Sequence, residues 1–303
     1  MSNSIAVFGS INMDLVIYSD TKPEEGETIF GNSFETFQGG KGANQAVAIS
    51  RLGGEVTFIG KIGNDIFGEQ LKESLVNEGV NIDFLYEHEG PSGVAFINVF
   101  EATSQNQIIV VSGANSQVTS NQVSDELLKS VQILVSQLEV PTDEMEKVFL
   151  RAKEYGCFRI LNTAPSIEIN KELISLTDLF IMNESELENY SKTKIQADDK
   201  TSISKAIENL SLRDDQSVVV TLGSHGVFVH SKDSQIFVEG HKVAAVDSTG
   251  SGDCFVGALA NDFLKNRDLI KAVKFANKAA ALSVTKKGAG ISMPTAEEVN
   301  TNL

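Results

Sequence analysis

Short apolar segments alternate with longer amphipathic ones through the second half of the chain. From residue 131 onward, stretches long enough for a helix separate four apolar segments, VQILVSQLE, FRILNTAP, DLFIMNE and SVVVTLG. Continuous apolar runs of this kind indicate strands buried on both faces, and the helices between them indicate parallel connections. A first strand is expected in SIAVFGS near the N-terminus. The pattern predicts an α/β fold with a doubly wound, mainly parallel sheet flanked by helices.

Polar or small residues follow each predicted strand. Asn12 and Asp14 come soon after the first one, and the later strands end beside Glu139, Asn162, Asn183, Thr221 and Gly223. Because open α/β sheets bind ligands beyond the carboxyl ends of their strands, the functional site is expected where these residues gather.

Two regions break the alternation of strands and helices. Residues 15–38 and 90–111, the latter with SGVAFINVF and NQIIVVSG, have strand patterns without helices between them. We therefore expect a small β layer made of two inserted segments, suited to a lid over a ligand or to a dimer surface. An ordinary antiparallel edge of the main sheet explains the same pattern.

The chain is strongly acidic, with a formal net charge of −16 and an isoelectric point of about 4.7. This charge argues against nucleic acid and anionic membranes as partners, because both repel a negative protein surface. An anionic ligand would have to be bound locally by backbone N–H groups, a few lysines or a metal ion.

Cysteine content and hydropathy indicate a cytoplasmic protein. Cys157 and Cys254 both lie in apolar surroundings and offer neither a disulfide framework nor metal-ligand spacing. The N-terminal MSNSIAVFGSINMD lacks the basic and long apolar regions of a signal peptide, and no segment reaches the roughly 18 apolar residues of a membrane span.

The segment DSTGSGDCFVGALA, residues 247–260, leads from glycines into an apolar helical pattern. Gly250, Ser251 and Gly252 leave room for a ligand to approach the first N–H groups of the helix, which attract anions. An aspartate at this position is by default a helix cap. Beside an anion site, however, the Asp253 carboxylate would suit removal of a hydroxyl proton during phosphoryl transfer to an alcohol.

The segment QGGKGANQAV, residues 38–47, places Lys41 and Asn44 at the start of a second helix, expected near Ala43. It is not a Walker A loop, because glycine and alanine follow the lysine where serine or threonine would be needed. Its glycines fit a tight turn, and equally fit a closely approached backbone whose polar side chains bind vicinal hydroxyls.

The segment GSINMD, residues 9–14, offers an amide and a carboxylate two positions apart. Asn12 and Asp14 would point to the same side of an extended chain and so could bind one polyol. Taken alone, the segment also fits a turn with an Asx residue.

The segment NESE, residues 183–186, follows the apolar run DLFIM. Asn183 and Glu186 fit a capping box at the start of the next helix. They also fit a magnesium and phosphate site, in which hard oxygen ligands hold a hydrated cation through water.

The order of these motifs resembles the PfkB family of carbohydrate kinases over essentially the whole chain. GSINMD, GGKGAN, a glutamate that ends a strand, NxxE, TLGSxG, DxxGxGD and a terminal VTKKGA occur in that order. Within the family the sequence is most similar to the ribokinase group. The resemblance implies a ribokinase-like fold, here a single kinase domain over residues 1–303, with a β lid and a homodimer formed through that lid.

The resemblance also implies a role for each motif residue. Asp253 matches the general base, and Gly250, Ser251 and Gly252 match the anion hole. The sugar-binding positions correspond to Asn12, Asp14, Gly40, Lys41, Asn44, Glu139 and Asp253. The ATP-binding positions correspond to Asn183, Thr221, Gly223, Gly252 and Asn277.

Two kinds of cation are implied by the same resemblance. Glu186 matches a residue that binds Mg2+ through water. A monovalent cation, usually K+, corresponds to Asp247, Thr249, Lys286, Gly288 and Ser292. Since a lysine amine cannot ligate a cation, Lys286 would act through its carbonyl oxygen.

The function implied is ATP-dependent phosphorylation of the primary 5-hydroxyl of D-ribose, which gives ribose 5-phosphate. Another furanose, a ketohexose or a nucleoside as acceptor would use the same chemistry, and a sugar-binding regulator without catalysis is a further alternative. Few apolar or aromatic residues flank the sugar motifs in the sequence, which favours a bare polyol over a nucleoside.

Overall fold

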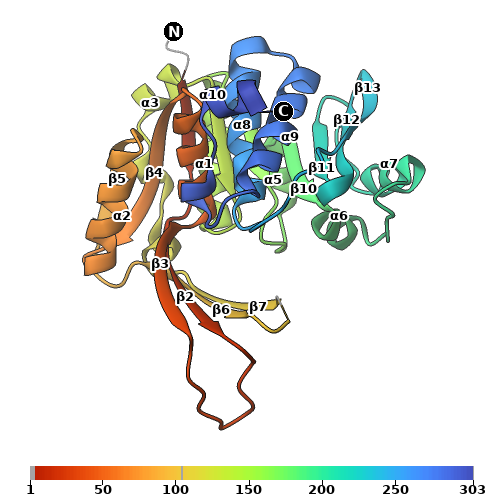
Figure 1. Cartoon of the computed structure of the whole chain (residues 1–303). Coiled ribbons are helices and arrows are strands. Elements are labelled where there is room, and N and C mark those ends of the chain that lie inside the picture. The colour runs from red at the N-terminus through yellow and green to blue at the C-terminus, as the bar shows by residue number, and fades with distance from the viewer. Residues whose placement is uncertain (1–3, 104, 303) are drawn as a thin grey trace.

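The computed structural model describes residues 4–103 and 105–302. Within these residues, nine strands form a main sheet. Neighbouring strands run parallel, except that β12 is antiparallel to both β11 and β13 at one edge. The strands lie in the order β13 (Ser234–Glu239), β12 (Gly226–Ser231), β11 (Ser217–Thr221), β10 (Leu179–Asn183), β9 (Phe158–Asn162), β8 (Ile133–Gln137), β1 (Ser4–Phe8), β4 (Glu55–Gly63) and β5 (Asn81–His88). This arrangement, visible in Figure 1, confirms the predicted doubly wound, mainly parallel sheet.

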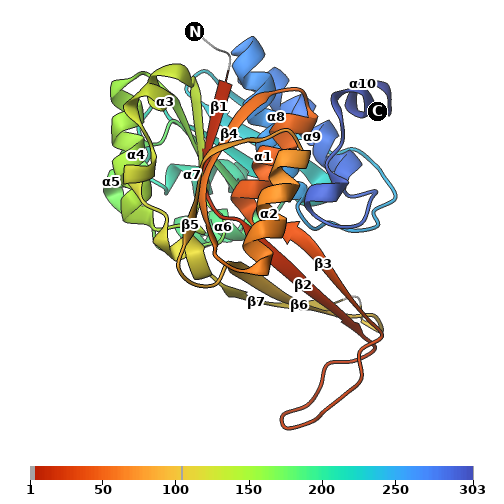
Figure 2. The same ribbon diagram turned by 90° about the vertical axis from the view of Figure 1, so that its left-hand side faces the viewer.

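Helices cover both faces of this sheet (Figures 1 and 2). One face packs against α1 (Lys41–Arg51), α2 (Ile66–Asn77), α8 (Ser251–Asn266), α9 (Leu269–Ser283) and α10 (Ala296–Asn302). The opposite face packs against α3 (Asp125–Ser130), α4 (Thr142–Glu154), α5 (Lys171–Leu176), α6 (Glu184–Ser191) and α7 (Lys200–Glu208). Over the described part of the chain, none of these helices combines the length and apolar character needed to cross a lipid bilayer.

Strand β1 shows why the apolar runs are continuous. Ile5 and Val7 belong to the hydrophobic core on one side of the sheet, whereas Ala6 and Phe8 belong to the core on the other side. Since successive side chains of a strand point to opposite faces, a strand covered on both faces must be apolar at every position.

A separate four-stranded sheet projects from the main body beyond the carboxyl ends of the strands (Figures 1 and 2). It consists of β3 (Ser33–Gly39), β2 (Asn12–Ser19), β6 (Gly93–Phe100) and β7 (Gln105–Val111), in that order. The predicted small β layer is confirmed, and the alternative of an ordinary edge of the main sheet is wrong, because these strands pair only with one another.

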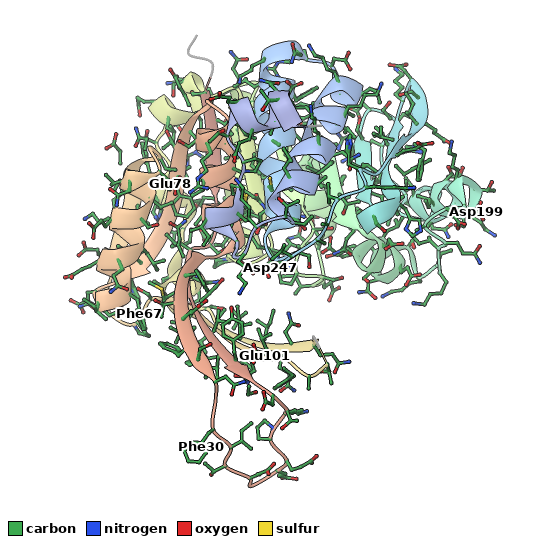
Figure 3. All side chains as sticks on the ribbon, viewed as in Figure 1. Phe30, Phe67, Glu78, Glu101, Asp199 and Asp247 are labelled. Atoms are coloured by element: carbon green, nitrogen blue, oxygen red, sulfur yellow. The ribbon has the colours of Figure 1, made fainter. Side chains whose placement is uncertain are left out.

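Residues 20–32 do not continue the strands predicted over residues 15–38. They form an exposed loop between β2 and β3, and Phe30 in this loop has 96% of its surface exposed (Figure 3). Shorter connections complete the chain as 3-10 helices, namely η1 (Gly113–Gln117), η2 (Ser120–Gln122), η3 (Gly223–His225) and η4 (Gly290–Ser292).

Candidate active site

The N-termini of α1 and α8 meet beyond the carboxyl ends of the central strands, and Asp253 lies between them. Its carboxylate is buried and accepts hydrogen bonds from Asn44 Nδ2 at 3.0 Å and Gln45 Nε2 at 3.1 Å. The N-cap residue of α8 is Gly250, which provides no side-chain cap. The capping alternative for Asp253 is therefore wrong, because its side chain is turned toward α1.

The glycines before Asp253 leave the start of α8 uncovered. Gly250 has a left-handed backbone with φ of 74°, and a Cβ there would lie 2.9 Å from the Cα of Ala289. A Cβ on Gly252 would meet no atom within 4 Å, so open space adjoins this turn. The Ser251 N–H donates to the Ser248 carbonyl at 3.2 Å, within the turn. The first turn of α8 thus has a bare, N–H-rich surface of the kind that binds anions.

Helix α1 begins at Lys41, two residues before the predicted start, because Gly40 is its N-cap. Gly40 has φ of 85°, and a Cβ there would lie 2.7 Å from Ile11 Cα and from Asn12 N. The glycine therefore lets the helix start directly against the segment that carries Asn12, so packing of two backbone segments accounts for this glycine.

Asn12 and Asp14 lie on strand β2, so the interpretation of GSINMD as an Asx turn is wrong. Being two positions apart on one strand, they face the same side, as predicted. Asn12 Oδ1 accepts a hydrogen bond from Asn115 Nδ2 at 2.7 Å. A Cβ on Gly39 would overlap the Asp14 carboxylate, so this carboxylate lies directly over a bare backbone.

Glu139 and Asn44 complete the polar group around Asp14 and Asp253. Glu139 Oε2 accepts hydrogen bonds from the Ser10 hydroxyl at 2.5 Å and from the Lys41 N–H at 3.1 Å. Among the described residues, Asn44 Oδ1 is buried without a hydrogen-bond partner. A buried acceptor without a partner is energetically costly.

A cavity of about 410 Å3 adjoins this polar group. Asn12 and Glu139 contribute polar walls, and the small sheet contributes Val110; further lining residues are Ser112, Asn115, Ser116, Leu138, Val140, Pro141 and Pro165. The expectation that few apolar groups surround the sugar motifs is wrong, because the fold brings in Val110 from a distant segment and turns residues flanking Glu139 into the cavity.

Burial and mutual repulsion change the acidity of these groups. Burial, together with the charges of Glu139 and Asp253, raises the pKa of Asp14 to about 7 despite the opposing effect of Lys41. Burial also raises the pKa of Asp253, while Lys41 and the hydrogen bonds from Asn44 and Gln45 oppose that rise.

Lys41 is the positive charge at the centre of this group. Burial lowers the pKa of Lys41, but the nearby carboxylates together raise it above its ordinary value; they belong to Asp253, Glu139, Glu186 and Asp14. The ammonium group therefore stays charged and balances several acids within one water-poor site.

A second cavity, of about 590 Å3, lies on the other side of the α8 N-terminus. It brings together the predicted nucleotide and anion-hole positions Thr221, Gly223, Ser251, Gly252 and Asn277. Asn277 is buried, and its Nδ2 donates to the Glu239 carbonyl at 2.8 Å, which fixes the end of β13 beside the cavity. The predicted sugar positions Asn12 and Glu139 thus line one cavity, and the start of α8 lines the other.

Asn183 and Glu186 form the capping box that one interpretation of NESE predicted. Asn183 Oδ1 accepts from the Glu186 N–H at 2.8 Å, and Glu186 Oε2 accepts from the Asn183 N–H at 3.0 Å. The Thr163 hydroxyl also donates to Glu186 Oε2 at 3.2 Å. Burial raises the pKa of Glu186. The charges of Lys41 and Asp253 also act on this pKa, so Glu186 lies near these two residues at the carboxyl ends of the strands.

The residues matched to a monovalent cation lie around the loop that precedes α8. Asp247 accepts hydrogen bonds from the N–H and hydroxyl of Thr249 at 2.9 and 2.6 Å, and from the Gly288 N–H at 2.9 Å. Figure 3 shows Asp247 at the edge of the main body above the small sheet. The Lys286 ammonium pairs with Glu298 at 2.6 Å, and the Ser292 hydroxyl donates to the Ala289 carbonyl at 2.8 Å.

Among the described residues, no group of three or more His, Cys, Asp or Glu side chains is placed to hold a metal ion. A divalent cation here would be bound mainly through water and ligand oxygens, which is the coordination that Mg2+ prefers.

Sequence reasoning missed three residues that hold the site together. Ser10 binds Glu139, Asn115 binds Asn12, and Gln45 binds Asp253. Gln45 directly follows Asn44 in the glycine-rich motif, so its position was a usable signal. Asn115 lies in η1 after the small sheet, and no local pattern connects it to residue 12.

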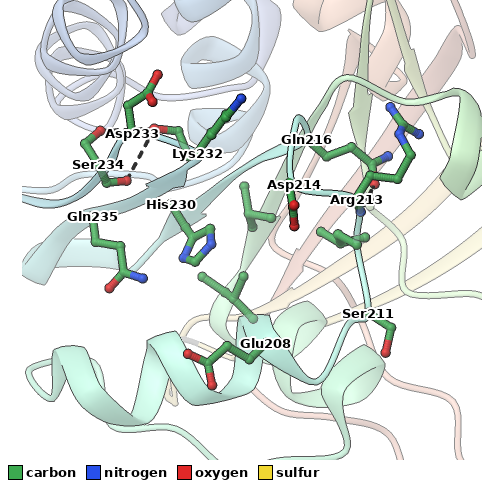
Figure 4. Close-up of a pocket in the computed structure, with 14 residues that line it drawn as sticks. Glu208, Ser211, Arg213, Asp214, Gln216, His230, Lys232, Asp233, Ser234 and Gln235 are labelled. Carbon is green, nitrogen blue, oxygen red and sulfur yellow. Dashed lines mark hydrogen bonds between the residues drawn. The ribbon is translucent and has the colours of Figure 1, made fainter.

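Another hollow, of about 640 Å3, lies between α7 and the β12–β13 hairpin (Figure 4). His230, Arg213 and Lys232 share its walls with acidic residues, Glu208, Asp214 and Asp233. Its mixed charges select no class of ligand, and none of the predicted site residues lines it.

Comparison with known proteins agrees with the motif order. The model of the pfkB family carbohydrate kinases matches residues 2–296. A ribokinase of Haemophilus influenzae is 38% identical over 301 residues, which cover 98% of this chain and 97% of that protein. A deoxyribokinase of Salmonella typhimurium is 35% identical, with 99% of this chain and 98% of that protein covered.

A solved structure gives the same result in three dimensions. The structure of Arabidopsis thaliana ribokinase complexed with ribose and ATP superposes with a TM-score of 0.90 at 30% identity, covering 99% of this chain and 98% of that one. The resemblance predicted from the motifs is thereby confirmed: the chain belongs to the PfkB family of carbohydrate kinases, as a ribokinase-type member.

Proposed function

We propose that the protein transfers the γ-phosphoryl group of ATP to the primary 5-hydroxyl of D-ribose and so forms ribose 5-phosphate. The observation that carries the proposal is the place of Asp253. Its buried carboxylate lies at the start of α8, where Ser251 and Gly252 line the larger cavity, and it accepts a hydrogen bond from Asn44 of the predicted sugar motif. The carboxylate would therefore lie between a sugar bound by that motif and phosphates bound at the start of α8.

The sugar would bind in the smaller cavity through hydroxyl hydrogen bonds. Asp14 and Glu139 are acceptors for hydroxyl protons, and Lys41 is a donor. The unpaired Asn44 Oδ1 would receive a further hydroxyl. The glycine at position 40 lets the start of α1 pack directly against the segment that carries Asn12, which would bring Lys41 and Asn12 to the same sugar.

ATP would bind in the larger cavity with its terminal phosphate toward the first turn of α8. Thr221, Gly223 and Asn277 would line the base and ribose portion, Asn183 would contact a phosphate, and the N–H groups of Gly250, Ser251 and Gly252 would form the anion hole. The positive end of the α8 dipole favours the extra negative charge on the transferring phosphoryl group, and the Ser251 N–H would exchange its bond to the Ser248 carbonyl for a phosphate oxygen.

In the transfer step, Asp253 accepts the proton of the 5-hydroxyl as that oxygen forms its bond to the γ-phosphorus. The bond from the γ-phosphorus to the bridging oxygen breaks at the same time, and ADP leaves with the electron pair. Most of the rate enhancement would come from positioning and charge stabilisation, as is general for phosphoryl transfer.

The oxygen-rich surroundings fit the two cations implied by the resemblance. Glu186, with its carboxylate fixed by its cap, would accept hydrogen bonds from the water ligands of Mg2+, which neutralises phosphate charge when bound. Asp247, Thr249 and Ser292, with the carbonyls of Lys286 and Gly288, would hold K+. The ion pair of Lys286 with Glu298 keeps its ammonium group engaged elsewhere, which agrees with a role for its carbonyl.

2-Deoxyribose is the strongest alternative acceptor, because a deoxyribokinase is nearly as similar to this chain as the ribokinases are. A ketohexose or nucleoside as acceptor would retain the same chemistry. The non-catalytic regulator has the least support, since Asp253 and both glycines of its motif are present.

We also propose that residues 1–303 act as one cytoplasmic kinase domain that dimerises through the small sheet, which would cover the sugar site as a lid. Cys157 and Cys254 are both unpaired, as in a reducing compartment. The small sheet exposes large apolar side chains that a partner subunit would cover, including Ile108 and Val110.

The test is an ADP-release assay of the full chain with MgATP and ribose, 2-deoxyribose, fructose or adenosine, with and without K+. Ribose is expected to give the highest kcat/KM, and 31P NMR should show a 5-phosphomonoester. Preference for 2-deoxyribose or fructose would overturn the assigned substrate, and absence of ADP release with all four would favour the regulator.

A further inference from the structure

A chain of buried amides lies behind the Asp253 carboxylate. Gln45 is fully buried, and its Nε2 donates to Asp253 Oδ1 at 3.1 Å and to Asn162 Oδ1 at 3.2 Å. Its Oε1 accepts from Gln137 Nε2 at 2.6 Å. Both N–H bonds of the Gln45 amide and its oxygen are therefore used.

The neighbours of Gln45 allow its amide only one orientation. Asn162 Nδ2 donates to the Ile181 carbonyl at 3.1 Å, so the Asn162 oxygen faces Gln45. Gln137 presents its nitrogen to Gln45, and because Gln137 Oε1 is buried without a partner among the described residues, this bond is what orients the Gln137 amide. A flipped Gln45 amide would place its oxygen against two other oxygens and its nitrogen against another nitrogen, and each contact would be repulsive.

We propose that Gln45, oriented by Asn162 and held at its oxygen by Gln137, is a positioning residue that directs the Asp253 carboxylate toward the acceptor hydroxyl. Asn44 holds Asp253 Oδ2 and Gln45 holds Oδ1, so the two bonds together fix the rotation of the carboxylate plane. One bond alone would leave that plane free to rotate. This inference rests on the proposed role of Asp253 as general base.

Because both glutamines are buried, a positioning role can be distinguished from direct binding of a ligand. Gln45 and Gln137 are both 0% exposed, so neither side chain contacts a molecule in the adjoining cavities. Gln137 donates to Gln45 and forms no hydrogen bond with Asp253, so its effect must pass through Gln45. Loss of either glutamine should lower kcat while sugar affinity is retained.

The hydrogen bond from Gln45 also opposes the rise that burial causes in the pKa of Asp253. The other titratable groups that act on Asp253 are Lys41, Glu139, Asp14, Glu186 and Cys254. All of them remain when Gln45 is replaced by methionine, so the loss of its N–H should raise the pKa of Asp253. The acidic limb of the kcat profile should then move to higher pH.

The test compares Gln45→Met, Gln137→Met and the double variant with Gln216→Met. Gln216 is also a buried glutamine, and its Nε2 donates to the Ile174 and Thr177 carbonyls at 2.7 Å, away from the site. Gln216→Met therefore controls for the loss of a buried amide. Circular dichroism verifies folding, a coupled ADP assay gives kcat and its pH profile, and calorimetry gives the dissociation constant of ribose.

Gln45→Met is expected to lower kcat by about 10- to 100-fold, the usual effect of losing one hydrogen bond to a charged group, with ribose affinity changed less than about threefold. Gln137→Met should lower kcat by a smaller factor, and it should add nothing in the Gln45→Met background. Gln216→Met should leave kcat within about twofold of the wild type.

Different results overturn the two proposals. A wild-type protein that phosphorylates no sugar overturns the proposed function, and the inference with it. An active wild type with Gln45→Met no slower than Gln216→Met overturns the positioning role alone. A full additional loss from Gln137→Met in the double variant also contradicts it. If Gln45→Met does not fold, Gln137→Met tests the role, because it leaves the contact between Gln45 and Asp253 in place.

Discussion

Asn44 and Asp253, 209 positions apart in the sequence, are joined by a 3.0 Å hydrogen bond between Nδ2 and Oδ2. The bond links the first turns of α1 and α8, and it thereby connects the glycine-rich segment of each helix. The proposed sugar-binding motif and the proposed phosphoryl-transfer motif therefore form one site, in which a change to either helix start affects both.

Replacing Asp253 by asparagine should abolish catalysis but retain the sugar site. An amide of the same size cannot accept the hydroxyl proton, so kcat should fall by about 10^2- to 10^4-fold. The ribose dissociation constant, measured by calorimetry, should change only a few-fold. Asp262→Asn on the same helix is the control and should leave kcat unchanged. Retention of more than a tenth of the wild-type kcat in Asp253→Asn would rule out the general-base role.

Ribose affinity should depend on pH through Asp14. Its pKa is about 7 in the folded protein, raised by burial and by Glu139 and Asp253. As pH falls from 8 to 6, the ionised fraction drops from about nine-tenths to about one-tenth, and a hydroxyl loses its best acceptor. The apparent dissociation constant should therefore rise about tenfold. In Asp14→Asn it should be nearly constant over this range, and a flat wild-type profile would contradict the assignment.

Much of this site could be predicted because its signals are local. The apolar runs of β8 to β11 revealed the buried strands, and the glycines before Asp253 revealed the uncovered helix start. The contacts that orient these residues could not be predicted, because they join distant segments. Asn115 reaches Asn12 only because β7 of the small sheet returns beside β6, and Gln137 reaches Gln45 only through helix-to-sheet packing.

The left-handed turn at Gly250 should be necessary for activity beyond its effect on folding. In Gly250→Ala, a Cβ at φ of 74° would lie 2.9 Å from Ala289 Cα, so the anion-hole backbone must move. We expect kcat to fall by about tenfold or more, and stability to fall by about 1–2 kcal/mol.

Gly53→Ala is the matched control for that variant. Gly53 also has φ of 74°, but an added Cβ meets no atom within 4 Å. Thermal unfolding should show a comparable loss from backbone strain in both variants, while only Gly250→Ala loses kcat. Equal kcat values in the two variants would show that the position of this turn does not matter for transfer.

The small sheet should hold two subunits together through the face that carries Asp14. Strand register places Val16, Ile97 and Ile108 side by side across β2, β6 and β7, on the same face as Asp14. Val16 and Ile97 belong to a small buried cluster, and Ile108, 55% exposed, continues it outward. A partner subunit that covers Ile108 would extend this cluster.

Ile108→Glu should therefore convert a dimer to a monomer, because it would bury an unpaired charge in the interface. Light scattering after size-exclusion chromatography at about 10 µM measures the mass. Ile66→Glu is the control, since Ile66 is 61% exposed but lies at the start of α2 on the main body. That variant should keep the dimer mass. A wild-type protein that elutes with the mass of one chain, or an Ile108→Glu variant that stays dimeric, would exclude this face as the interface.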